Sequence, residues 1–236
     1  MRVYFVKRKA YSTTAAVITP AISFLASLVL TGIMLAAFNI NPFSVYASMF
    51  EGAFGTWRDF TETLVKAIPL ILTSLGVATA FKLRFWNIGA EGQLVLGGVA
   101  AAWVALFWSS WLPPFLLLPA AIIIGAAAGG LWAGIPALLK VRLNVDETLT
   151  TLMLNYAAIL MYDGIYNGPW RDPDGYGFPG SAQFVQAAWL PRISGRVHLG
   201  LVFALIAAAL LWFAFYKSKW GFELQMIGKN KRAARA

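Results

Sequence analysis

Three polar side chains with helical spacing stand in a stretch that is otherwise mostly apolar. Glu147, Thr151 and Asn155 follow one another at intervals of four residues, so a helix would place them on one face. Asn155 would lie in the middle of that helix, where an amide without hydrogen-bond partners is costly. The three residues can therefore line a polar pathway or hold neighbouring helices together. Glu147 can also cap the helix, because Asn144 and Glu147 have the spacing of a capping box.

A second polar cluster lies in residues 87–93, where two amides and a carboxylate alternate with glycines. Glycines permit a turn or an interrupted helix, and transporters use the exposed backbone of interrupted helices to bind polar substrates. The segment can equally be a turn followed by the capped start of a helix. The candidate residues of a substrate pathway are Asn87, Glu91, Gln93, Glu147, Thr151 and Asn155.

Two further segments stand outside the apolar stretches. Residues 168–196 are rich in proline and too polar to span a membrane, so they can be a docking surface for an external partner or an ordered loop over helix ends. Residues 221–236 combine basic residues with alanines. That composition suggests a short amphipathic helix at a membrane surface or a simple basic flank.

The sequence contains no catalytic or metal-binding constellation. It has no Cys and a single His, His198, which excludes disulfides, zinc clusters and sites built on several His ligands. The G-x-x-x-x-G-K-[ST] phosphate loop and the G-x-S-x-G and H-E-x-x-H motifs are missing. We therefore expect no enzyme activity, no cofactor and no metal, and no ATP hydrolysis by a phosphate loop of this chain.

The composition indicates that these polar residues belong to a membrane protein. Hydrophobic residues make up 59% of the 236 residues and charged residues 12%, whereas about 45–50% and 25% are usual in soluble domains. Long runs with few or no charges predict an all-α, polytopic transmembrane bundle with about six spans. The predicted spans cover approximately residues 15–38, 64–81, 94–111, 115–139, 147–166 and 197–216.

The basic residues between the spans predict the orientation of the chain. Of the 19 Lys and Arg residues, 14 fall on the side of the two termini and five on the other side. By the positive-inside rule, both termini lie in the cytoplasm and residues 168–196 lie outside. The net charge of +9 then needs no nucleic-acid partner. A cleaved signal peptide is the less favoured alternative for the first span, because its apolar stretch exceeds the usual length of about 7–15 residues.

Two G-x-x-x-G repeats mark the predicted fourth span, at Gly125–Gly129 and Gly130–Gly134. Small residues at this spacing let helix backbones approach closely in lipid. They favour a buried, tightly packed helix, with a pore-lining role as the alternative.

Four motifs in the right order support a family resemblance. The stretch F-W-N-I-G-A-E-G-Q at 85–93 resembles the F-N-I-G-A-E-G-Q of bacterial ABC-transporter permeases in the branched-chain amino acid/ribose permease family, simple-sugar and nucleoside branch. The stretch V-D-E-T-L-T-T-L-M-L-N at 145–155 is similar to that branch's V-N-E-x-x-T-T-x-M-L-N, with Asp146 in place of Asn. Residues 168–173 resemble its outer loop, and residues 221–234 resemble its G-x-x-L-R-A-x-G-x-N-x-x-A-A stretch.

The resemblance implies a permease subunit of an ABC importer for nucleosides or simple sugars, in the bacterial inner membrane. It implies as partners a second permease subunit, two cytoplasmic ATP-binding subunits, an extracytoplasmic substrate-binding lipoprotein and membrane lipid. Residues 1–236 would form the N-terminal part of a longer permease domain, because family members continue past this point. The residues that the resemblance assigns to ATPase coupling are Gly228, Asn230, Ala233 and Ala234.

Other functions stay open at this stage. A branched-chain amino acid importer permease fits the wider family, and a non-transporting membrane scaffold or truncated remnant fits the length. A membrane-embedded enzyme acting on lipid or prenyl substrates is a different class, but the sequence lacks the acidic metal cluster that would favour it.

Overall fold

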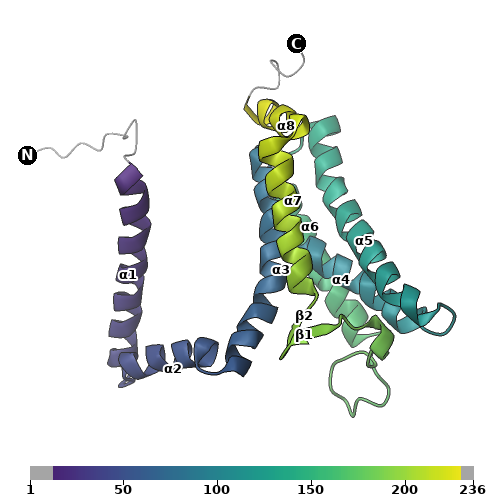
Figure 1. Ribbon diagram of the computed structural model, residues 1–236, viewed down its shortest axis with the longest axis horizontal. Helices are drawn as coiled ribbons and strands as arrows, with labels where there is room; N and C mark the ends of the chain where they lie inside the picture. Colours follow the sequence, from purple (N-terminus) through teal and green to yellow (C-terminus); the bar gives the residue numbers. More distant parts are fainter. Residues whose placement is uncertain (1–12, 230–236) are drawn as a thin grey trace, which may run out of the picture. The chain divides into compact units, whose positions relative to one another are not determined.

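The computed structural model describes residues 13–229, which are mainly helical (Figure 1). The chain divides into two compact units with a boundary between Thr63 and Leu64, and each is described by itself. The helices are α1 (Thr13–Ala37), α2 (Pro42–Phe54), α3 (Trp57–Lys82), α4 (Ala90–Phe107), α5 (Pro114–Leu143), α6 (Glu147–Asn167), α7 (Gly200–Lys217) and α8 (Lys219–Lys229). Between α6 and α7 lie the short 3-10 helix η1 (Gln186–Ala188) and an antiparallel pair of strands, β1 (Arg192–Ser194) and β2 (Val197–His198).

The first unit contains α1, α2 and the beginning of α3. Asn41 caps α2, because its side-chain oxygen accepts a hydrogen bond from the Phe43 N–H at 3.0 Å, and a proline at the next position suits the first turn of a helix. The hydroxyl of Tyr46 on α2 donates to the Leu28 carbonyl of α1 at 2.6 Å. The sequence analysis did not predict α2, since its apolar residues lie in the same charge-free run as the first span.

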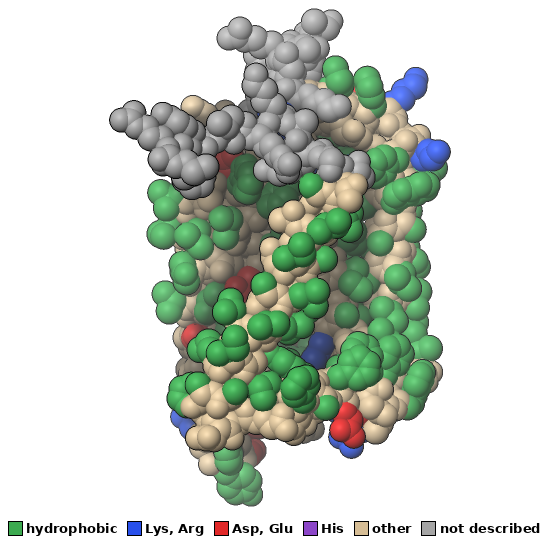
Figure 2. Space-filling view, turned by 90° about the vertical axis from the view of Figure 1, so that its left-hand side faces the viewer, with side chains coloured by type: hydrophobic (Ala, Val, Ile, Leu, Met, Phe, Trp, Pro, Cys, Tyr) green, Lys and Arg blue, Asp and Glu red, His purple; other side chains and the backbone are tan. Residues whose placement is uncertain are grey.

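Five helices are long and apolar enough to cross a membrane, namely α1, α3, α4, α5 and α7. They confirm the prediction of a polytopic helical membrane protein. Figure 2 shows hydrophobic side chains spread over the face that it presents, as a lipid environment requires. The helix α6 forms where a span was predicted, but it is not among the five, because threonines, asparagines and acidic residues reduce its apolar character.

The bounds of several helices differ from the predicted spans. The predicted span 64–81 is part of a longer helix that begins at Trp57, since Lys66 does not interrupt helical backbone. The predicted span 94–111 begins earlier, at Ala90, and ends at Phe107. The predicted span 197–216 begins later, because Val197 belongs to β2 and α7 starts at Gly200.

Within the second unit, α4 and α5 pack backbone to backbone through glycines. A Cβ atom added to Gly97 would lie 2.9 Å from the Gly125 carbonyl oxygen, and one added to Gly125 would lie 2.9 Å from the Gly97 oxygen. Gly129 approaches the Gln93 carbonyl equally closely. The first G-x-x-x-G repeat therefore mediates helix packing, as expected. The second repeat does not, because a Cβ at Gly130 would meet no described atom within 4 Å.

Replacing Gly97 by Ala is expected to destabilise the protein by about 1–3 kcal/mol, the usual cost of overpacking. The new methyl group would meet a backbone carbonyl, which cannot rotate away as a side chain can. Thermal unfolding of the detergent-purified protein would measure the loss. Gly98→Ala is the matched control, because a Cβ there has no described atom within 4 Å. Equal midpoints for the two variants would contradict the packing account.

The third helix contacts α7 through a few side chains. Near its C-terminal end, the Lys82 ammonium lies 3.0 Å from the Tyr216 hydroxyl and 4.2 Å from the centre of that ring. Further along the helix, Ile68 lies against Gly200 at the start of α7. Two open grooves lie between α3 and the start of α4, and α5 also lines one of them.

Candidate functional site

The two predicted polar clusters meet where the start of α4 lies against α6. Asn155 is 7% exposed, and its Oδ1 atom accepts a hydrogen bond from the Gly92 N–H. Its Nδ2 atom donates to the Glu91 carboxylate at 3.4 Å. A Cβ at position 92 would lie 2.9 Å from the Asn155 Cα. Only glycine therefore lets α4 approach α6 closely enough for this buried amide to find its partners.

Thr151, one turn earlier on α6, holds the segment that precedes α4. Its hydroxyl donates to the Glu147 carbonyl at 2.8 Å and accepts from the Ile88 N–H at 3.1 Å. A Cβ at Gly89 would lie 2.7 Å from the Thr151 carbonyl oxygen. Thr151 is only 1% exposed, so its polar atoms serve this contact and not solvent.

Asn87 and Gln93 form a pair of side-chain amides across the start of α4. The Asn87 Nδ2 donates to Gln93 Oε1 at 3.1 Å, and the Gln93 Nε2 donates to Asn87 Oδ1 at 3.2 Å. Asn87 Oδ1 also accepts from the Gly89 N–H at 3.0 Å. Residues 85–89 are non-helical and α4 begins at Ala90. The segment is therefore a turn followed by a helix start, and not an interrupted helix.

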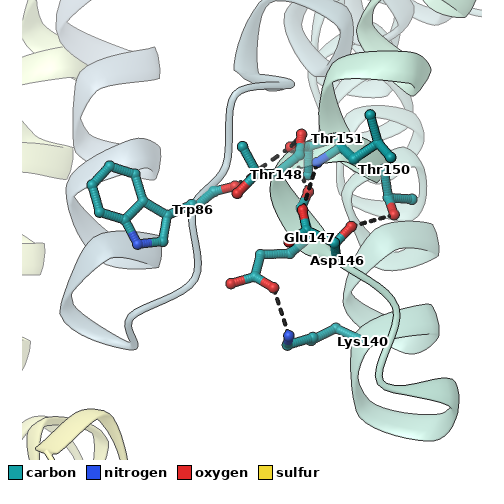
Figure 3. Close-up of polar contacts among 8 residues, drawn as sticks. Trp86, Lys140, Asp146, Glu147, Thr148, Thr150 and Thr151 are labelled. Atoms are coloured by element: carbon teal, nitrogen blue, oxygen red, sulfur yellow. Dashed lines mark hydrogen bonds and ion pairs between the residues drawn. The ribbon is translucent and has the colours of Figure 1, made fainter.

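Glu147 lies at the edge of this network, where its backbone carbonyl accepts from Thr151. Its carboxylate forms an ion pair with Lys140, in the last turn of α5, at 2.7 Å (Figure 3). The proposed capping box was wrong. Asp146 is the N-cap of α6 and accepts from the Leu149 N–H at 2.9 Å, whereas Asn144 adopts φ 53° and ends α5. Only residues 144–146 separate the two helices, and among them Asn144 closes α5 and Asp146 caps α6.

The structure thus brings the six candidate pathway residues together, with the Glu147 carboxylate at the edge, paired with Lys140. Thr151 and Asn155 are buried, and their hydrogen bonds join helices. Glu91 is exposed and lines an open groove with two residues of α3, Lys66 and Ser74. Sequence reasoning did not select Lys140, Lys66 or Ser74 for the site. Lys140 could have been found from its position at the end of a predicted span, seven residues before the oppositely charged Glu147.

The candidate coupling residues fall at the end of the described chain. Gly228 is buried in α8, where a Cβ would meet the Lys82 carbonyl and lie 3.4 Å from the Leu83 Cα. The three other candidates, Asn230, Ala233 and Ala234, lie outside the described residues. The helix α8 confirms a short helix in this region, and it starts at Lys219.

Within residues 13–229, no group of three or more His, Asp or Glu side chains is placed to hold a metal ion.

Comparisons with known proteins agree with the membrane architecture. Residues 60–236 match the family described as "Branched-chain amino acid transport system / permease component". The chain is 38% identical to a glucose ABC transporter permease protein of Haloferax volcanii, over 92% of this chain and 60% of the relative. It is 36% identical to a guanosine ABC transporter permease protein of Bacillus subtilis, over 92% and 63%. A nucleoside ABC transporter permease protein of Lactococcus lactis is 30% identical, over 94% and 63%.

The chain therefore spans somewhat less than two thirds of the length of these relatives. No solved structure matches it.

Proposed function

We propose, from the premise that this chain belongs to the family of branched-chain amino acid transport system permease components, that it forms part of the membrane pathway of an ABC importer. Its proposed cargo is a nucleoside or a simple sugar, because the relatives that match most of the chain are named for glucose, guanosine and nucleosides. One structural observation supports this proposal above all. The two family-like motifs, at 85–93 and 145–155, lie far apart in sequence and form one hydrogen-bonded site between α4 and α6.

The proposal includes the partners that an ABC importer needs. They are a second permease subunit, cytoplasmic ATP-binding subunits that hydrolyse the ATP, and an extracytoplasmic substrate-binding lipoprotein. We place the chain in the bacterial inner membrane with both termini in the cytoplasm. Contact with the ATPase is proposed for α8 and residues 228–234.

A branched-chain amino acid permease is the second candidate, because the description of the matching family names that cargo. Deleting the gene in its host and measuring the uptake of radiolabelled guanosine, glucose and leucine separates the two. We expect guanosine or glucose uptake to fall to background and to return when the gene is restored, with leucine uptake unchanged. A selective loss of leucine uptake would support the second candidate. Unchanged uptake of all three would contradict a role in importing any of these solutes.

The proposed orientation predicts the outcome of cysteine labelling, which the Cys-free sequence makes simple. In intact cells, a membrane-impermeant maleimide is expected to label Asp174→Cys, in the exposed loop between α6 and η1, but not Lys219→Cys at the start of α8. Both variants should react once the membrane is permeabilised. Labelling of Lys219→Cys alone in intact cells would reverse the orientation.

A further inference from the structure

We propose that the groove between α3 and the start of α4 binds the transported solute, and that this solute is a neutral molecule rich in hydroxyl or amide groups. The inference rests on the proposed transport function and deepens it. The groove has a volume of about 740 Å³, within the range of about 300–1,000 Å³ that small-molecule sites occupy. Its polar lining residues are Lys66, Thr73 and Ser74 on α3 and Glu91 on α4.

Ser74 distinguishes the groove from an ordinary lipid-facing surface. It lies eight residues before the end of α3, or about 12 Å along a helix with a rise of 1.5 Å per residue, which is well inside a bilayer core of about 30 Å. Thr73 and Thr79 donate their hydroxyl groups to the carbonyls four residues earlier, at 2.8 Å each. Ser74 is exposed and, among the described residues, makes no such bond. A hydroxyl group in this position favours a polar occupant over lipid.

The groove also carries a charged group at each end. Lys66 is exposed on α3 and makes no hydrogen bond or ion pair within residues 13–229. Glu91 lies at the opposite end, because α4 starts close to the end of α3 and the groove extends along α3 from Lys66 to Phe81. Ionised side chains within spans almost always face a bundle interior or a water-filled cavity. We therefore assign this face of α3 to a solute pathway and not to lipid.

The lining of the groove favours a neutral solute. Its α3 wall runs from Lys66 to Phe81, fifteen residues or about 22 Å on a helix, so most of the groove lies away from Lys66. Between the ends the lining is apolar apart from hydroxyl groups. A neutral nucleoside or sugar can bond to Ser74 and then to Glu91 without bringing a charge into this middle part, where desolvation of an ion would be costly.

Cysteine protection tests the proposal in the assembled transporter. Ser74→Cys is expected to retain uptake and to react with a positively charged, membrane-impermeant methanethiosulfonate, which should then block uptake. Guanosine, or glucose if that is the solute imported, should slow the reaction about tenfold at ten times its dissociation constant, because bound solute leaves only the unoccupied fraction reactive. Leu70→Cys, one turn earlier in the same groove, is expected to show the same reactivity and the same protection by solute. It replaces Ser74→Cys in the test if that variant fails to assemble.

Leu131→Cys is the matched control, since Leu131 is 75% exposed on α5 and lines neither groove. We expect it to be unreactive toward the charged reagent in the membrane. If the wild-type complex imports the solute but the groove cysteines are unreactive, or react without protection, the groove proposal is wrong and the proposed function stands. If the wild-type complex imports neither guanosine nor glucose, the proposed cargo fails, and this inference fails with it.

Discussion

Replacing Asn155 by Leu is expected to destabilise the contact between α4 and α6 by about 1–3 kcal/mol, the cost of leaving a buried donor unpaired. The Asn155 amide is the partner of the Gly92 N–H, which is buried at the first turn of α4. Leucine has a similar volume but offers no acceptor, and water has no access to replace it. The unfolding midpoint of the purified protein should fall by about 2–4 °C for each kcal/mol lost.

Asn167→Leu is the control for the Asn155 variant. Asn167 lies on the same helix, but it is exposed and bonds only to the Asp163 carbonyl one turn away. We expect little change in its unfolding midpoint. Equal midpoint changes in both variants would contradict the helix-joining role of Asn155. A normal midpoint with lost uptake in the Asn155 variant would instead place this amide directly on the solute pathway.

The polar site could be predicted in large part because its signals are local. A helical spacing of four residues placed Thr151 and Asn155 on one face of α6, and the glycines at 89 and 92 indicated a close backbone approach. The pairing of these two clusters could not be derived from spacing. It depends on which helices pack together, and that in turn depends on backbone fit between residues distant in sequence, such as Gly97 and Gly125.

The capping residues show where sequence rules are ambiguous. Asn144, Asp146 and Glu147 can each serve a helix end, and the N-x-x-E spacing favoured Asn144 as the cap. In the structure α5 continues to Leu143, so Asn144 must close that helix in a left-handed conformation, and Asp146 becomes the cap of α6. The length of α5 therefore determines which residue caps which helix, although each capping rule is valid by itself.

The residues of the groove assigned to the solute could not be predicted from the sequence. Ser74 and Lys66 carry no motif, and a serine in an apolar helix usually bonds to its own backbone. Only the placement of α3 beside the start of α4 brings Ser74 and Lys66 into an open groove shared with Glu91. Residues of this kind become candidates through packing, after the helices have been placed.

Adding a single methyl group to Gly228 is expected to displace α8 and to reduce solute uptake about tenfold, which corresponds to about 1.4 kcal/mol. A Cβ at this position would run into the Lys82 carbonyl oxygen, and overpacking against backbone typically costs about 1–3 kcal/mol. The effect should extend beyond α8, because Lys82 leads into the turn whose Ile88 N–H is bonded to Thr151. This continuous set of contacts connects the proposed ATPase-facing helix to the polar site, so a shift of α8 can reach that site through packed atoms.

Limited trypsin digestion and uptake measured on the same Gly228→Ala preparation test this connection. A displaced α8 should be cleaved faster after Lys217 and Lys219, at the junction between α7 and α8, while the amount of protein in the membrane stays unchanged. Gly164→Ala is the control, because a Cβ there has no described atom within 4 Å; we expect it to match the wild type in both measurements. Faster cleavage with normal uptake would show that α8 is held by Gly228 but does not transmit coupling through Lys82. Wild-type cleavage together with wild-type uptake would mean that the helix tolerates the methyl group and that the packing of Gly228 is not a constraint.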